Sequence, residues 1–197
     1  MDRQISFGQY RMIDNILFGV ILVISEIVII TAAGKWFPGQ LYTVSAAAAV
    51  TAIVMMRWGI WSALHAALAG IVYVGVQGGT FEQLLIYVLG NELSLAALLL
   101  IKAAGREKIK DNVLLTVLYA LTVQLLMQAG RGGVAFAFGA GVGAIPKFIT
   151  MDILSELFTV LIVFIASRLD GIFEDQKTYL LRMQQKDENQ NGEDQNG

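Results

Sequence analysis

The sequence contains no cysteine, which excludes disulfide bonds, thiolate metal ligands and a cysteine nucleophile. It contains one histidine, His65, with no second histidine or carboxylate cluster at metal-ligand spacing. We therefore expect this side chain to pack or to form a hydrogen bond, and we expect no metal site. The motifs His-Glu-x-x-His and Gly-x-Ser-x-Gly are also absent, and no serine pairs with His65 at a shared depth. We predict that the chain is not an enzyme.

Charge is scarce as well. Only 15% of the 197 residues are charged and 56% are hydrophobic, with a mean hydropathy of +0.62, whereas soluble domains carry about 25% charged residues. The net charge of −2 and the lack of a basic stripe argue against nucleic-acid binding. So little polar surface cannot cover a water-soluble globule, and the composition predicts an integral membrane protein in contact with the lipid bilayer.

Six apolar runs have roughly the 20 residues that a helix needs to cross a bilayer. They cover residues 15–33, 40–56, 58–76, 81–103, 112–129 and 148–169. The second and third are separated by little more than Arg57 and could fuse or tilt. The first run is full length, with no small-residue cleavage site at its end, which indicates a retained helix and not a removed signal peptide. We predict an all-α membrane protein with about six transmembrane helices over residues 1–170, and a polar, largely disordered tail over residues 171–197.

The basic residues predict the orientation. Of the 14 lysines and arginines, only Lys35, Arg131 and Lys147 would lie outside if the N-terminus were cytoplasmic. Short cytoplasmic loops carry an excess of lysine and arginine. Both chain ends are therefore expected in the cytoplasm.

Polar residues gather at one depth, in the outer halves of five predicted helices. Several occur as pairs four residues apart, which places each pair on one helix face. Such a cluster favours a polar cavity that opens outward and binds a small ligand; the alternative is that the side chains hydrogen-bond one another between helices. The candidate binding residues are Glu26, Trp36 (as a stacking lid), Tyr87, Asn91, Gln124, Gln128, Asp152 and Glu156.

The charge of the ligand stays open at this point. The excess of carboxylates favours a cationic or hydrogen-donating ligand. Alternatively, Arg131 and Lys147 neutralise two of the acids and the ligand is neutral. The glycine-rich segment 130–147 lacks the Gly-Lys-Ser/Thr ending of a phosphate-binding loop, and it favours a flexible lid or a re-entrant loop.

Small residues in the third run allow a close approach between helices. Ala63 and Ala67, and Ala66 and Gly70, are small residues four apart, which suits helix packing in lipid. They serve either packing within the bundle or docking of another membrane subunit, for which Ala63, Ala67 and Gly70 are the candidates.

Several local patterns resemble one transporter family over about residues 10–170. They are Phe37-Pro38-Gly39-Gln40-Leu41-Tyr42, the alanine-rich second run, Met56-Arg57-Trp58-Gly59 and Ala66-Ala67-Leu68-Ala69-Gly70. With the six-helix layout, they are similar to the substrate-binding S components of energy-coupling factor (ECF) transporters.

The resemblance implies a subunit of a prokaryotic plasma membrane that captures a vitamin or related micronutrient from outside. It would dock onto a transmembrane coupling subunit with two ATPase subunits, which hydrolyse the ATP, so that this chain itself needs no cofactor. Many members carry Ala-x-x-x-Ala in the first helix; here only Asn15 and Gly19 come near, so the third helix could supply the docking face.

Two other functions remain. A non-transporting scaffold subunit of a membrane complex would need no ligand, and a lipid-modifying enzyme would need a catalytic cluster that the sequence does not show.

Overall fold

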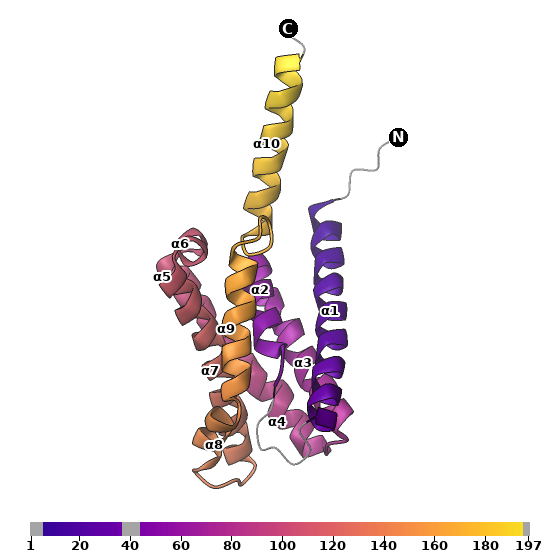
Figure 1. Ribbon diagram of the computed structural model, residues 1–197, viewed down its shortest axis with the longest axis vertical. Coiled ribbons are helices and arrows are strands. Elements are labelled where there is room, and N and C mark those ends of the chain that lie inside the picture. Colours follow the sequence, from indigo (N-terminus) through magenta and orange to yellow (C-terminus); the bar gives the residue numbers. More distant parts are fainter. Residues whose placement is uncertain (1–5, 37–43, 195–197) are drawn as a thin grey trace.

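The computed structural model describes residues 6–36 and 44–194, which form helices and short connections (Figure 1). The structure is 86% helical with no strand among the described residues, which confirms the all-α class. The elements are α1 (Phe7–Trp36), α2 (Ala47–Trp58), η1 (Gly59–Trp61), α3 (Ser62–Gln77), α4 (Phe81–Asn91), η2 (Glu92–Ala97), α5 (Leu98–Ala104), α6 (Arg106–Asp111), α7 (Val113–Ala137), α8 (Ala144–Met151), α9 (Ile153–Ser167) and α10 (Gln176–Asp194).

Four helical stretches in the described chain are long and apolar enough to cross a membrane. They are Phe7–Trp36, Ala47–Gln77, Phe81–Ala104 and Val113–Ala137. A fifth is present if α8 and α9, which meet at an angle of 55°, count as one span. The structure therefore supports a multi-spanning membrane protein. The predicted runs 40–56 and 58–76 overlap one such stretch, which begins at Ala47, and residues 40–43 lie outside the described part.

Within that stretch, α2 and α3 reverse direction. Three hydrogen bonds to α1 establish this: Ser45 Oγ to Glu26 (2.6 Å), Trp58 Nε1 to Asp14 (2.5 Å) and His65 Nε2 with the carbonyl of Asn15 (3.0 Å). From the start to the end of α2, the contacted residue of α1 changes from Glu26 to Asp14. Along α3 it changes from Asn15, at His65, to Gly19, at Leu68. Hence α2 runs antiparallel to α1 and α3 runs parallel to it. Gly59 makes the turn with a φ of 59°, a conformation that favours glycine.

The centre of the bundle is α2, all of whose residues are buried. Its alanines present little side-chain bulk, so neighbouring helices pack closely around it. By contrast, one face of α1 is apolar and exposed, with Ile16, Val20 and Ile24 each at least half exposed. An apolar outer face around a buried small-residue helix suits lipid as the surrounding solvent.

The glycine-rich segment differs from the expected lid. Its first part continues α7 as far as Ala137, and α8 begins at Ala144. Gly130 and Gly132 remain helical because other helices pack directly on their backbones: a Cβ on Gly132 would lie 2.5 Å from the Cα of Ile145 in α8. Tertiary packing here overrides the low helix propensity of glycine.

Both ends of the described chain lie at one end of the bundle, called here the terminal end (Figure 1). Tyr10 Oη near the start of α1 donates a hydrogen bond to Gln176 at the start of α10 (3.2 Å). The tail differs from the largely disordered segment that we expected, since residues 176–194 form α10. Ion pairs Arg106–Asp175 (2.5 Å) and Lys110–Glu174 (3.1 Å) attach the segment before α10 to the α5–α6 region.

Candidate functional site

Three of the predicted binding residues meet around Arg131 of α7. Its Nε donates to Asn91 Oδ1 of α4 (2.6 Å), and its Nη1 forms an ion pair with Asp152 (3.3 Å). Gln128 Nε2, one turn earlier on α7, donates to the same carboxylate oxygen of Asp152. Asn91 also donates to the carbonyl of Ala66 in α3 (2.8 Å). These four polar side chains are all buried, so three helices and the α8–α9 junction share one internal network.

An aromatic wall covers one side of this network. The guanidinium of Arg131 lies 4.7 Å from the centre of the Tyr87 ring, within the range of a cation–π contact. Tyr87 stacks on Tyr73 with ring centres 4.5 Å apart, and Phe148 of α8 approaches it edge-on at 6.1 Å. The cation of Arg131 is thus held between an aromatic face and a carboxylate.

The crossing of α4 and α7 explains why these residues meet. A Cβ on Gly90 would lie 2.5 Å from the Cα of Arg131, and one on Gly130 would overlap the carbonyl of Gly90. The two backbones therefore touch at this pair of glycines. The next residue on each helix is Asn91 on α4 and Arg131 on α7, which brings their side chains together.

Asp152 occupies the break between α8 and α9. It belongs to neither helix, and the axes on its two sides differ by 55°. Irregular backbone at membrane depth is tolerated where protein or a polar cavity surrounds it. The break thus turns a buried carboxylate towards α7.

Three more predicted residues lie near this network. Glu26 is fully buried and accepts a hydrogen bond from Ser45. Its carboxyl also lies against the backbone N–H groups of Ala46 and Ala47 at the start of α2 and within reach of the charge of Arg131. Gln124 accepts a hydrogen bond from Thr159 of α9 (3.1 Å). Glu156 follows Asp152 by one turn and is half-buried. We call the predicted residues of this region, together with Arg131, the polar cluster: Glu26, Tyr87, Asn91, Gln124, Gln128, Arg131, Asp152 and Glu156.

Some buried oxygens of the polar cluster have no hydrogen-bond partner among the described residues. They are Glu26 Oε2, Gln128 Oε1 and Glu156 Oε1. All three are acceptors when the two carboxylates are ionised. With both carboxyls ionised, the unused capacity of the cluster is therefore for hydrogen-bond donors.

Trp36, the predicted stacking lid, makes no contact with the polar cluster that the hydrogen bonds or ring contacts of the described residues record. It is the last residue of α1 and is 75% exposed. The stretch 37–42 that contributed to the family resemblance lies outside the described residues.

Of the predicted docking residues, Gly70 packs inside the bundle, since a Cβ there would lie 2.8 Å from the backbone of Tyr87. Ala63 and Ala67 are half-buried. His65 forms the hydrogen bond with Asn15 described above, one of the two roles expected for it.

The sequence predicted that Asn91, Gln128 and Asp152 lie together, but it did not indicate Arg131 as the residue that joins them. The signal was present: Arg131 is a single cation between apolar and glycine residues, and a charge in such a setting must be paired. One of the two open alternatives, partial neutralisation of the acids by Arg131, is realised with Asp152. Lys147 forms no ion pair with any described residue.

The described residues contain no group of three or more histidine, cysteine or acidic side chains that could hold a metal ion. The fold and the site thus define a class, an all-α protein with several membrane-compatible helices around a buried polar cluster. Comparisons with protein-family models, with curated proteins and with solved structures find no match to this chain.

Proposed function

We propose that this chain is the membrane-embedded, substrate-binding subunit of a micronutrient uptake system, similar to the S components of ECF transporters. The observation that carries the proposal is the buried Arg131–Asp152 pair, set at a helix break and bonded to Asn91 and Gln128. Ionisable groups inside a membrane protein are costly and mark ligand or ion sites by default. Broken helices at such depth form the substrate sites of many transporters.

The unpaired acceptors indicate the chemistry of the ligand. Glu26 Oε2, Gln128 Oε1 and Glu156 Oε1 favour a small molecule with several N–H or O–H donors. The rings of Tyr73, Tyr87 and Phe148 would pack against an apolar or aromatic part of it. A vitamin or vitamin precursor with a polar heteroaromatic group combines both properties.

The proposal includes six spans, in which the second and third predicted runs cross the membrane separately. Both chain ends would face the cytoplasm of a prokaryotic cell, with the chain in the plasma membrane. The cations Arg57, Arg106 and Lys110 at the terminal end support this orientation.

A coupling subunit and two ATPase subunits would power the uptake, and ATP would be hydrolysed there. The backbone of α4 packs directly on Gly70, so this glycine is not free to contact another subunit. We therefore place the docking contacts on Ala63 and Ala67 of α3, which are half-buried.

One observation favours a second function, a scaffold subunit without a ligand. The guanidinium of Arg131 already bonds to Asn91 and Asp152 within the chain. The backbones of α4 and α7 also pack directly on each other at Gly90 and Gly130. A structural network of this kind would hold a bundle together without binding anything.

A thermal-shift screen of the detergent-purified full chain separates the two functions. The panel contains vitamins, their precursors, nucleobases and polyamines. A ligand at 100 times its dissociation constant stabilises the folded state by about 2.7 kcal/mol, which gives a clear shift. Glu26→Gln retains an oxygen for Ser45 but removes the charge, and it should abolish the shift; Asn91→Ala should do so too.

Asp175→Asn, at the terminal end, is the matched control and should leave the shift intact. A flat response of the wild type across the panel would contradict the uptake function and favour the scaffold.

A further inference from the structure

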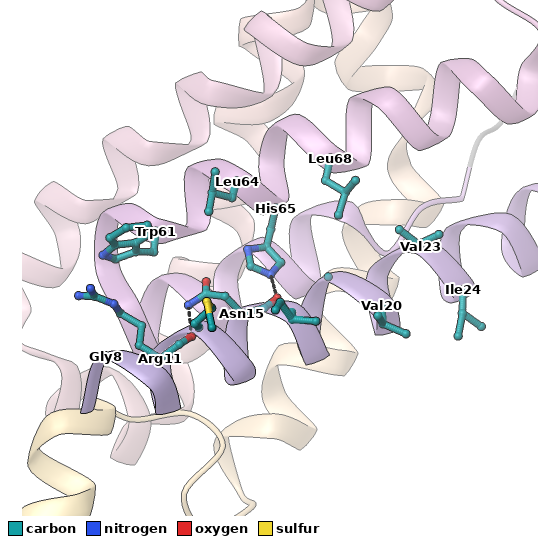
Figure 2. A pocket seen from close by; sticks show the side chains of 13 residues that line it. Gly8, Arg11, Asn15, Val20, Val23, Ile24, Trp61, Leu64, His65 and Leu68 are labelled. Atoms are coloured by element: carbon teal, nitrogen blue, oxygen red, sulfur yellow. Dashed lines mark hydrogen bonds between the residues drawn. The ribbon is translucent and has the colours of Figure 1, made fainter. Parts of the chain in front are cut away.

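A groove of about 700 Å³ lies on the outside of the bundle between α1 and α3 (Figure 2), and none of its lining residues belongs to the polar cluster. Its two walls run parallel. Figure 2 shows Arg11 and Trp61 at one end, Asn15 with His65 in the middle, and Val20 and Ile24 at the other end. The residues from Arg11 to Ile24 extend over about 20 Å of helix at 1.5 Å per residue, which exceeds half of the ~30 Å hydrocarbon core.

The groove is apolar along most of this length. Ile16 and Leu64, on opposite walls, are 58% and 57% exposed. Gly19 gives the groove its depth, because a Cβ there would meet only Leu68 Cδ2, at 3.6 Å. The groove is therefore apolar and open to the surrounding lipid.

Charge is confined to the end of the groove nearest the start of α1. The Arg11 guanidinium lies 4.5 Å from the centre of the Trp61 ring. Arg11 forms no ion pair with any described residue. Tryptophan and arginine side chains of this kind sit at the membrane–water interface. A cation at the interface that has no carboxylate partner within the described chain is complementary to a phosphate.

We propose that the groove binds one anionic phospholipid, with an acyl chain between α1 and α3 and the headgroup phosphate on Arg11. A partner helix fits less well, since close helix contacts in lipid need small residues along the whole interface. Apart from Gly8 and Gly19, the groove is lined by larger side chains, such as Val23, Leu64 and Leu68. The proposal does not depend on the proposed uptake function, because the groove shares no residue with the polar cluster.

Native mass spectrometry of the full chain tests this proposal. The detergent-purified protein is titrated with phosphatidylglycerol or with phosphatidylcholine of the same acyl chains. We expect phosphatidylglycerol to bind about fivefold more tightly, the factor that corresponds to about 1 kcal/mol for one basic residue at the membrane surface. Arg11→Gln should weaken phosphatidylglycerol more than phosphatidylcholine, whose choline cation already offsets part of the attraction between its phosphate and Arg11, and should so remove the preference. Gly19→Leu should fill the groove and weaken both lipids.

Arg168→Gln is the matched control, because Arg168 lies over the Phe164 ring (5.0 Å) but does not line the groove. It should leave both lipids unchanged. Equal binding of the two lipids to the wild type, or the same loss in Arg168→Gln as in Arg11→Gln, would overturn the proposal. So would a Gly19→Leu protein that keeps its lipid affinities but loses a co-purifying membrane protein, since the groove would then hold a partner helix.

Discussion

The buried ion pair between Asp14 and Arg57 should dominate the stability of the terminal end. Asp14 accepts hydrogen bonds from Arg57 Nε (2.8 Å), Arg57 Nη2 (2.7 Å) and Trp58 Nε1 (2.5 Å). Arg57 Nη1 donates to the carbonyls of Gly171 (2.5 Å) and Ile172 (3.0 Å) before α10. The side chains of Arg57 and Asp14 are only 4% and 8% exposed. One pair therefore joins α1, the α2–α3 turn and the C-terminal segment.

Asp14→Ala leaves the guanidinium of Arg57 and the indole N–H of Trp58 buried without their acceptor. Breaking a buried pair by removing one partner costs about 3–5 kcal/mol, so we expect a loss of this size in the free energy of unfolding. Arg57→Met should cost a similar amount. The double variant Asp14→Ala/Arg57→Met should cost much less than the sum, because no buried charge is then left unpaired.

Reversible unfolding in mixed detergent–SDS micelles measures these free energies. Asp170→Ala is the control, because the Asp170–Arg182 pair is 3.9 Å long with side chains 78% and 54% exposed; it should cost less than about 1 kcal/mol. Additive losses in the cycle, or a loss in Asp14→Ala no larger than in the control, would refute the reasoning.

Two further predictions concern helix packing and pH. Gly130→Ala should destabilise the bundle by about 1–3 kcal/mol, the cost of overpacking, because its Cβ would overlap the carbonyl of Gly90. A Cβ on Gly133 has nothing within 4 Å, so Gly133→Ala should leave the stability unchanged or raise it. The same unfolding assay compares the two variants, and equal effects would contradict the contact between Gly130 and Gly90. Burial raises the pKa of the Glu174 carboxyl, but the hydrogen bonds from Lys110 and the Gly171 N–H and the charges of Lys110 and Arg182 outweigh it, so the pKa lies below its ordinary value of 4.5. The stabilisation from Glu174 is then complete above pH 4.5 and is lost as the pH falls through the lowered pKa. Proteolysis of α10 in the wild type should therefore increase over that acidic range. If Glu174→Gln shows the same pH profile of proteolysis as the wild type, this account is wrong.

Much of the fold could be predicted because membrane helices are encoded by long apolar runs. The runs 81–103 and 112–129 correspond closely to α4–α5 and to the first part of α7. The spacing and depth of polar residues in the sequence also indicated that Asn91, Gln128 and Asp152 lie together, since each helix offers few buried polar positions.

The remainder depended on tertiary contacts that leave little trace in composition. The sequence placed a short turn at Arg57 between the second and third runs but left open whether the two runs fuse. The bonds of Trp58 and His65 to α1 decide for a reversal, at Gly59. The helical state of Gly130 depends on the backbone of α4. Arg131 could be recognised as a charge that needed a partner, but its choice of Asp152 follows from the 55° break between α8 and α9.

The two buried charge clusters differ in a way that separates stability from binding. At the terminal end, Asp14 and Arg57 bond to each other, and Arg57 also donates to the carbonyl of Gly171. The hydrogen-bonding partners of this pair are therefore supplied by the chain itself. In the polar cluster, the ion pair of Arg131 is also complete, yet Glu26 keeps a buried oxygen without a described partner. An unpaired buried acceptor costs about 1–3 kcal/mol, and a donor on a ligand would recover it. Asp14→Ala should therefore lower stability and keep the thermal shift caused by a ligand, whereas Glu26→Gln should keep stability and lose the shift.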